Sequence, residues 1–498
     1  MLVSTIEKAK ENLQVENLEW KKLKSEKRFR KSTQQNNLPG VVRSAFEADY
    51  DRIVGSSSVR RLQDKAQVFP LQEDDVARTR LTHSIEVSAL ARSLGKAVGM
   101  ELEKKGAFTR KDTEELAAIL QTAGLVHDLG NPPFGHYGET VIQKWFEKWF
   151  DAEGKNVADS LSDQQKNDFL FFDGNVQNLR ILMKLQTHYD QFGANFTFAT
   201  LGTIIKYPRD SIKCAEKGNK KFGFFFSETS QFQDICFELG LNPGARHPAT
   251  YLLEAADDII YLCDDIEDGV KKAYINWPTE YENIKNNLQM SITKYKEMAG
   301  LFNRIESKNP DKRLSLQEQE IAKSRNFRNY VQSYLFSKAV KGFFDNENRI
   351  MANEEYEGLE LLESEKALIE ELQRVTKMHC FSSREVISLE LTGNKVITGL
   401  LDVFVPAIVN AKGSDLCNIK TYEGKLFSLI SKNFVYSSVN PYCEENNSFF
   451  EDSEKYAIAI DKLTAYDKIQ LCLDFISGMT DTYALTIYQK LFGIVTPI

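Results

Sequence analysis

The sequence has few of the residues that interrupt or cross-link a chain. Its 498 residues include 12 prolines, 27 glycines and seven cysteines. Because proline breaks helices and glycine weakens them, their scarcity favours long, uninterrupted elements, most of them helices. The cysteines are odd in number, widely spread and without a CxxC spacing. This pattern excludes a disulfide framework and a cysteine zinc site, and it is typical of reduced thiols in a cytoplasmic protein.

Long apolar runs and an excess of positive charge are also missing. We find no run of about 18 apolar residues and therefore expect no membrane span, and the charged residues 1–10 lack the apolar core of a signal peptide. The net charge of −8 excludes the global basic field that nucleic-acid-binding modules often have. P-loop, GxGxxG and nucleophile-elbow motifs are absent, as are internal repeats.

One local basic cluster lies near the N-terminus, in a charged and helix-prone segment. It consists of Lys21, Lys22, Lys24, Lys27, Arg28, Arg30 and Lys31. Such clusters are more often a solvated helix face. A contact with phosphate or nucleic acid is the second interpretation.

Histidine is scarce too, with six in the chain, yet two of them lie within residues 127–139. The pair His127-Asp128 ends a helical segment, and a Gly/Pro-rich break follows at residues 130–133. A new helix then begins with His136 and Glu139. Their spacing of three puts both side chains on one helix face, which predicts a separate acid–base pair.

Two predicted helices each carry a histidine on their apolar face. In residues 76–99, His83 continues the stripe of Val87, Leu90, Leu94 and Val98; in residues 113–128, His127 continues that of Leu116, Leu120 and Ala123. A lone histidine on such a face is more often a satisfied core residue. Antiparallel packing of the two helices, however, would bring both histidines to one point.

A third helix, predicted for residues 249–266, is apolar almost all round and should be buried. It nevertheless carries several acids, among which Asp257, Tyr261 and Asp265 follow at intervals of four. Buried carboxylates must be paired, hydrogen-bonded or bound to a cation. Attraction of acids to a helix N-terminus fades beyond the first turn, so it does not explain Asp257 or Asp265.

The remaining pattern predicts the connecting elements. We expect a polar loop or insertion over residues 151–170, a helix over 173–189 and a short strand or packed loop over 222–226. Residues 309–313 are predicted as a loop within a largely helical region. Residues 474–489 are predicted as a single amphipathic helix.

Together these residues predict metal-assisted phosphate chemistry. Two imidazoles and two carboxylates, from His83, His127, Asp128 and Asp257, suit Mn²⁺, Fe²⁺, Co²⁺, Ni²⁺ or Zn²⁺. A strict preference for Mg²⁺ is less natural because that ion favours oxygen ligands. His136, oriented by Glu139, can transfer a proton, and the cations Arg80 and Lys206 suit phosphate. The inferred reaction class is phosphoester or phosphoanhydride hydrolysis.

The spacing H…HD…D at His83, His127-Asp128 and Asp257 resembles the HD superfamily of metal-dependent phosphohydrolases. A longer match resembles the bacterial deoxyguanosinetriphosphate triphosphohydrolases (dGTPases), with Lys65-Ala66-Gln67 standing where Lys-Thr-Gln is usual. This match covers residues 60–70, 78–84, 127–139, 254–259 and the Ser-Gly-Met-Thr-Asp of residues 477–481.

The resemblance implies a mostly α-helical HD fold with at most minor β structure and a homo-oligomer, commonly a hexamer. We expect an N-terminal helical arm (1–40), an HD-type catalytic core (41–285) and a C-terminal helical region packed on the core (286–498). The implied reaction is hydrolysis of dGTP to deoxyguanosine and triphosphate, by water attack on the α-phosphorus, with Mn²⁺ or Mg²⁺. Some relatives bind single-stranded DNA, which gives the basic cluster a role.

The resemblance also implies roles for individual residues. His83, His127, Asp128 and Asp257 match metal ligands, and His136 and Glu139 match the catalytic pair. Tyr261 and Asp265 match positions that close on the sugar. The positions matching contacts to base, sugar and phosphate are Gln67, Arg80, Asn175 and Lys206.

Three alternatives stay open. One is a dNTPase of broader specificity that a second dNTP activates. Another is a different HD enzyme, a phosphodiesterase or 5′-nucleotidase, which would release pyrophosphate, phosphate or a nucleotide. The third is a nucleotide or nucleic-acid sensor in which hydrolysis is secondary, and salt-dependent binding of single-stranded DNA would distinguish it.

Overall fold

The computed structural model describes residues 17–30, 43–67, 78–186, 191–216, 221–356, 358–442 and 453–495. Within these ranges the chain is helical, and the one β feature is an isolated antiparallel bridge between Ala66 and Thr79. The predicted fold class, mostly α with at most minor β, is confirmed. Much of the arm predicted for residues 1–40 lies outside the described residues.

Two long antiparallel helices form the centre of the fold. They are α5 (Arg80–Lys104) and α6 (Arg110–Val126), each starting at a threonine whose side chain closes a capping box. A Cβ at Gly124 would lie 2.7 Å from the Cα of Ser88. The two backbones therefore approach too closely for any larger residue, and this packing fixes the register between the helices.

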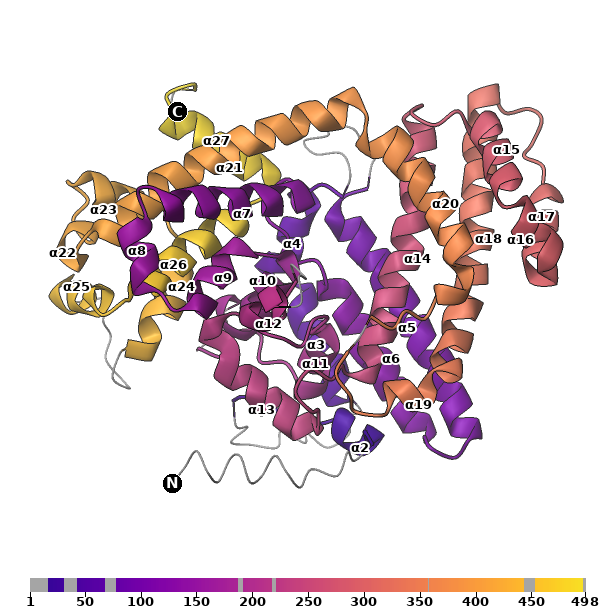
Figure 1. Cartoon of the computed structure of the whole chain (residues 1–498), viewed down its shortest axis with the longest axis horizontal. Coiled ribbons are helices and arrows are strands. Elements are labelled where there is room, and N and C mark those ends of the chain that lie inside the picture. Colours follow the sequence, from indigo (N-terminus) through magenta and orange to yellow (C-terminus); the bar gives the residue numbers. More distant parts are fainter. Residues whose placement is uncertain are drawn as a thin grey trace.

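The third central helix, α14 (Pro248–Lys271), packs against both α5 and α6. Proline at its first position costs no hydrogen bond, and the His247 side chain caps its N-terminus. The predictions of helices at 76–99, 113–128 and 249–266 are confirmed, with ends displaced by a few residues. All three helices lie close together in Figure 1.

The C-terminal half surrounds this centre. α18 (Leu316–Asp345) and α20 (Lys366–Thr376) pack on α14, while α21 (Arg384–Asn410) packs on α7 (Gly135–Asp151) and on α26 (Ala465–Ser477). In Figure 1, α21 runs along one side of the molecule beside α7. The limits predicted for the three regions, at residues 40 and 285, stay a prediction.

The other helices are shorter and complete the layers around these elements. They are α2 (Trp20–Leu23), α3 (Ala45–Val54), α4 (Ser57–Arg61), α11 (Phe198–Ile204), α12 (Ser211–Glu216), α13 (Thr229–Leu239), α15 (Trp277–Asn287), α16 (Gln289–Lys294), α17 (Lys296–Glu306), α19 (Glu347–Ile350), α22 (Gly413–Leu416), α23 (Tyr422–Phe427), α24 (Lys432–Val439), α25 (Ser453–Asp461) and α27 (Asp481–Leu491).

Helix α21 is the one helix in the described part of the chain that is long and apolar enough to cross a membrane. The buried core helix of a soluble protein meets the same criteria. Of the apolar stretch in α21, 56% is buried within the fold.

Two predictions of local structure are wrong. Residues 151–170, expected as a polar loop, form α8 (Lys155–Ser160) and α9 (Asp163–Leu170), because Ser162 and Gln165 make a capping box that starts α9. Residues 474–489 are not one helix: α26 ends before Gly478, and Thr480 caps a new helix, α27.

Other local predictions hold in part. Over 173–189 the chain forms α10 (Gly174–Arg180) and a π-helical turn, η2 (Ile181–Leu185), while residues 187–189 lie outside the described part. At 222–226 the packed-loop alternative holds, since the residues are irregular up to a 3₁₀ turn, η3 (Phe226–Glu228). The predicted loop at 309–313 is confirmed between α17 and α18.

We expect Asp474→Ala to lower the free energy of unfolding by about 3–5 kcal/mol, because it removes one of the two carboxylates that pair with a buried arginine. Asp474, on α26, is fully buried, and its oxygens accept from Arg180 Nε (2.8 Å) and Nη2 (2.7 Å). Among the described residues, Glu228, 2.7 Å from Nη1, is the charged partner that Arg180 keeps. Urea denaturation measures the loss, and the exposed Asp159→Ala is the control. A loss below about 1 kcal/mol, the worth of an exposed pair, would contradict the prediction.

Candidate metal-dependent active site

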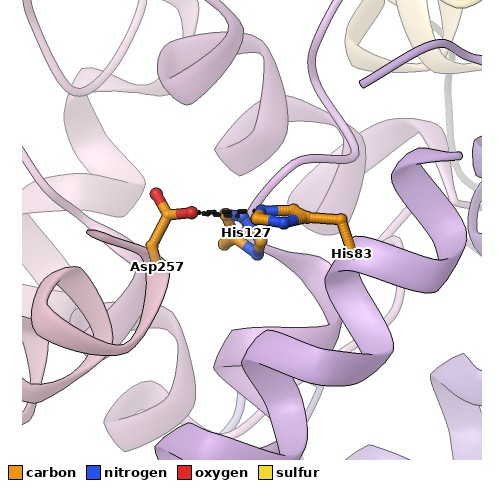
Figure 2. A group of neighbouring side chains, drawn as sticks. All are labelled: His83, His127 and Asp257. Atoms are coloured by element: carbon orange, nitrogen blue, oxygen red, sulfur yellow. Dashed lines mark hydrogen bonds and ion pairs between the residues drawn. The ribbon is translucent and has the colours of Figure 1, made fainter. Parts of the chain in front are cut away.

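Three side chains from the three central helices meet at one point, as Figure 2 shows. Asp257 Oδ1, on α14, lies 3.1 Å from His83 Nε2 of α5 and 3.4 Å from His127 Nε2, which directly follows α6. The two imidazole centroids are 5.3 Å apart. One potential ligand atom from each residue lies within 4.8 Å of the others, so the predicted convergence of both histidines with Asp257 is confirmed.

Asp128 lies beside this group rather than inside it. Its Oδ1 is 3.7 Å from His127 Nε2 and accepts a hydrogen bond from Asn131 Nδ2 (2.6 Å). Its Oδ2 is paired with Arg80 Nη1 at 2.5 Å. Arg80 therefore holds the fourth predicted ligand beside the other three.

The residues present fit a divalent cation. The Nδ1–H of His127 donates to the Gly124 carbonyl at 2.8 Å, so Nε2 is the ring atom that would bind a cation when it is deprotonated. That Nε2 atom is buried and has no hydrogen-bond partner, although it faces two carboxylates. A donor set of two imidazoles and one or two carboxylates suits a divalent transition ion and can accept Mg²⁺.

The charges of this cluster support one another. Burial of the His127 ring lowers its pKa, but the negative charges of Asp128 and Asp257 outweigh burial and raise the pKa to about 9. Burial raises the pKa of Asp257, but the two histidines outweigh it and hold that pKa well below its usual range. The carboxylate is therefore ionised at neutral pH and ready to bind a cation.

The second predicted pair is also brought together. His136 Nδ1 lies 3.4 Å from Glu139 Oε2 in the first turn of α7, and Glu139 Oε1 accepts from the Gly174 N–H at 2.9 Å. The carboxyl group is buried, whereas the His136 side chain is 76% exposed. The hydrogen bond to Glu139 raises the pKa of His136. An anchored acid thus orients an accessible imidazole, and the catalytic role of the pair stays a prediction.

A cavity of about 300 Å³ connects these groups. Nine of the twelve predicted site residues line it: Gln67, Arg80, His127, Asp128, His136, Asn175, Lys206, Asp257 and Tyr261. His83 and Glu139 lie behind this lining and contact residues in it. Asp265, predicted to close on the sugar, is not among the lining residues, and its side chain is 3% exposed.

Several lining residues were not predicted from the sequence. Lys221, paired with Asp173 at 2.5 Å, and Tyr207 bring further polar groups to the cavity. Lys221 ends a basic loop and Tyr207 follows Lys206, so both had weak sequence signals. Phe381 also lines the cavity, nearly parallel to the Tyr261 ring at 13° and 6.4 Å between centroids. No motif pointed to Phe381.

The basic cluster near the N-terminus is partly used inside the fold. Lys24 pairs with Asp112 and with Glu115, the latter at 2.8 Å. Lys27 Nζ lies 2.8 Å from Glu238, and Arg28 Nη1 lies 2.5 Å from the buried Asp49. These three cations therefore tie the segment to the core. The predicted contact of the cluster with single-stranded DNA stays a prediction.

We expect Glu139→Gln to lower the pKa of His136 toward its ordinary value of about 6.5. The imidazolium loses a negatively charged acceptor, so its proton leaves at lower pH than in the wild type. An NMR titration of the His136 ring measures the shift, with Glu147→Gln, an exposed substitution further along α7, as the control. An unchanged or higher pKa would contradict the assigned contact.

Comparison with known proteins extends the sequence match over nearly the whole chain. The family model of the HD domain matches residues 80–181. A "deoxyguanosinetriphosphate triphosphohydrolase-like protein" of Listeria monocytogenes is 37% identical, covering 96% of this chain and all of that protein. One from Synechocystis is 32% identical with the same coverage. The Salmonella paratyphi A protein named deoxyguanosinetriphosphate triphosphohydrolase is 31% identical, covering 90% of this chain and 94% of its own.

Proposed function

The chain belongs to the HD-domain family of deoxyguanosinetriphosphate triphosphohydrolase-like proteins, and from this premise we propose that it is a metal-dependent dNTP triphosphohydrolase that prefers dGTP. Water adds to the α-phosphorus, the bond from phosphorus to O5′ breaks, and deoxyguanosine and triphosphate leave. The observation that carries the proposal is a single cavity joining the cluster of His83, His127 and Asp257 to His136.

The ligand set consists of His83, His127, Asp128 and Asp257. A divalent ion held there, Mn²⁺ or Mg²⁺, supplies the positive charge that polarises a phosphoryl oxygen. Arg80, paired with Asp128 at 2.5 Å, orients this carboxylate and adds a fixed cation at the same wall of the cavity.

His136 is the proton donor to the leaving O5′. Its Nδ1 is turned toward Glu139, so Nε2 is the atom free to transfer a proton. The raised pKa keeps more of the ring protonated near neutral pH, as a general acid requires. Glu139, fixed by the Gly174 N–H, keeps the ring in this orientation.

The rest of the cavity suits a nucleoside triphosphate. Arg80, Lys206 and Lys221 supply cationic donors for phosphate oxygens. Among the described residues, the buried Oε1 of Gln67 has no hydrogen-bond partner, and such an acceptor can pair with an N–H donor of a base, as guanine provides. Asn175, at the start of α10, and Tyr261 supply further polar groups for the sugar and phosphates.

Product analysis tests the proposal. Purified protein is incubated with Mn²⁺ or Mg²⁺ and each dNTP, alone and in mixtures, and deoxynucleoside and triphosphate are quantified. We expect deoxyguanosine and triphosphate in equal amounts from dGTP alone. Activity only in mixtures would replace this proposal with an activator-dependent dNTPase. Pyrophosphate or phosphate as the product would assign a different HD activity.

We also propose that the active form is a homohexamer, as the family resemblance implies. Analytical ultracentrifugation of the wild-type protein at assay concentration tests this point. A monomer that retains full specific activity would contradict it.

A further inference from the structure

The segment 477–482, which runs from the last residue of α26 into the first turn of α27, has no role in the proposed chemistry, although its sequence is part of the family resemblance. It lies along residues 61–66, far away in the sequence. Four hydrogen bonds join the two segments: Arg61 Nη1 to the Gly478 carbonyl (3.4 Å), Lys65 Nζ to the Ser477 carbonyl (3.2 Å), Ala66 N–H to Asp481 Oδ2 (3.0 Å) and Thr482 Oγ1 to Asp64 Oδ1 (2.7 Å).

Asp481 differs from the other residues of this segment because it also contacts the turn at Phe134 and Gly135 that precedes His136 (the catalytic turn). Its Oδ1 accepts from the Phe134 N–H at 2.9 Å, while Oδ2 accepts from Ala66. The Asp481 side chain is buried, with 2% of the residue exposed. The Asp481 carboxylate thus joins Ala66, which precedes Gln67, to Phe134, which lies two residues before His136. Gln67 and His136 both line the cavity.

The turn that Asp481 holds is not one that the chain would adopt unaided. Phe134 has a φ of 61°, in the left-handed region that residues with a Cβ rarely occupy. Gly135, which follows, has the same φ. The Phe134 ring packs against Gly393 of α21, where an added Cβ would lie 2.6 Å from Phe134 Cγ. Ring packing and the Asp481 hydrogen bond therefore fix this backbone together.

Lys65 extends the same connection toward the metal ligands. Its buried ammonium donates to the Asn131 carbonyl as well as to Ser477, and the Asn131 side chain donates to Asp128 Oδ1. The backbone carbonyl of Lys65 accepts from the Arg80 N–H at 3.0 Å. Burial lowers the pKa of Lys65 to about 7 and raises the pKa of Asp481, and the attraction between the two opposite charges offsets part of each shift.

We propose that Asp481 is a positioning residue for the reaction: it fixes the left-handed turn at Phe134 and thereby aims His136 at the leaving oxygen. This inference rests on the proposed function, because it assigns His136 as the proton donor. The C-terminal helices thereby help to position the site, because Asp481 holds the backbone N–H groups of Ala66 and Phe134.

Asp481→Asn tests the proposal. The carboxamide keeps one acceptor and presents an NH₂ group to the second N–H, so one of the two hydrogen bonds is lost. We expect kcat to fall about 10- to 100-fold, since a misplacement of about 1 Å costs up to this much. KM and the affinity for Mn²⁺ should change less than about twofold, because the ligand cluster keeps its own contacts.

Asp461→Asn is the matched control. Asp461 also accepts from a backbone N–H in the C-terminal region, that of Gly413 at 2.6 Å, but neither Asp461 nor Gly413 adjoins a residue that lines the cavity. We expect this variant to keep wild-type kcat. If circular dichroism shows that Asp481→Asn does not fold, Asp481→Glu takes its place; it keeps both acceptors but displaces them by a methylene, and kcat should fall at unchanged KM.

A double-mutant cycle separates positioning from general destabilisation. In a His136→Ala background, Asp481→Asn should change the single-turnover rate constant less than about twofold, because the residue that Asp481 positions is gone. A further decrease of the rate constant by 10-fold or more in that background would overturn the proposal. A wild-type kcat in the single variant Asp481→Asn would overturn it as well.

Hydrogen exchange gives a readout that does not depend on turnover. The amides of residues 134–137 should exchange at least about tenfold faster in Asp481→Asn than in the wild type or in Asp461→Asn, because a lost restraint of about 1.4 kcal/mol opens the turn by this factor. Unchanged exchange would overturn the inference even if the wild type proved inactive on dNTPs. An inactive wild type would instead overturn the proposed function.

Discussion

Asp257→Ala is expected to abolish binding of the divalent ion and to lower kcat by about 10³-fold or more. Asp257 is the only residue of the tight cluster on α14, and its Oδ1 lies within 3.4 Å of both histidines. After the substitution, the imidazoles of His83 and His127, whether neutral or protonated, provide no anionic ligand in place of the Asp257 carboxylate. Loss of the several kcal/mol that a bound ion supplies to phosphoryl transfer corresponds to a decrease of this size.

Metal content after dialysis and calorimetric titration with Mn²⁺ measure the first effect, and triphosphate release measures the second. Asp234→Ala, an exposed aspartate on α13, removes the same charge away from the cavity and should match the wild type. Stoichiometric Mn²⁺ in Asp257→Ala would show that the cluster is not the metal site.

His136→Ala should lower kcat by about 10²- to 10⁴-fold, the usual contribution of a general acid, while metal and nucleotide binding persist. The reason is the geometry of the pair. The His136 side chain is exposed to the cavity, and within the described residues it makes no hydrogen bond or ion pair with His83, His127 or Asp257. Its removal therefore leaves the metal ligands in their contacts.

Single-turnover rates and equilibrium binding of a dNTP with Ca²⁺ separate the two effects. His379→Ala is a matched control, because His379 pairs with Glu280 at 3.1 Å and does not line the cavity. Undiminished release of triphosphate by His136→Ala would refute the proton-donor assignment.

The central part of the site could be predicted because its signals are local. Helical periodicity put His83 and His127 on apolar faces, and the Gly/Pro-rich break at residues 130–133 marked the end of the second helix. The buried acid Asp257 stood out on an apolar helix for the same reason. The antiparallel packing of α5 and α6, which their short connection favours, brings the two histidines together, and the packing of α14 on both helices adds Asp257.

Asp265 shows where periodicity misleads. It follows Asp257 by eight residues, and at about 100° per residue this rotates it by about 80° round the helix and two turns along it. The two side chains therefore share a broad face without reaching the same cavity. Asp265 is buried deeper in the fold, where its Oδ2 has no hydrogen-bond partner.

Phe381 and Asp481 could not be assigned from local pattern because tertiary packing alone brings them to the site. Phe381 ends a π-helical turn, η5 (Lys377–Phe381), which follows α20, and it reaches the cavity because α20 and η5 both pack on α14. Asp481 reaches the catalytic turn because Gly478–Thr480 ends one helix and starts another, a break that the apolar residues on either side concealed. Contacts over several hundred residues leave no periodic signal in the sequence.

Hydrolysis of dGTP in ¹⁸O-labelled water tests the central claim most directly. The proposed attack of water on the α-phosphorus breaks the bond to O5′, so mass spectrometry should find one ¹⁸O in the triphosphate and none in the deoxyguanosine. Label in the deoxyguanosine, or labelled pyrophosphate or phosphate in place of triphosphate, would contradict the account.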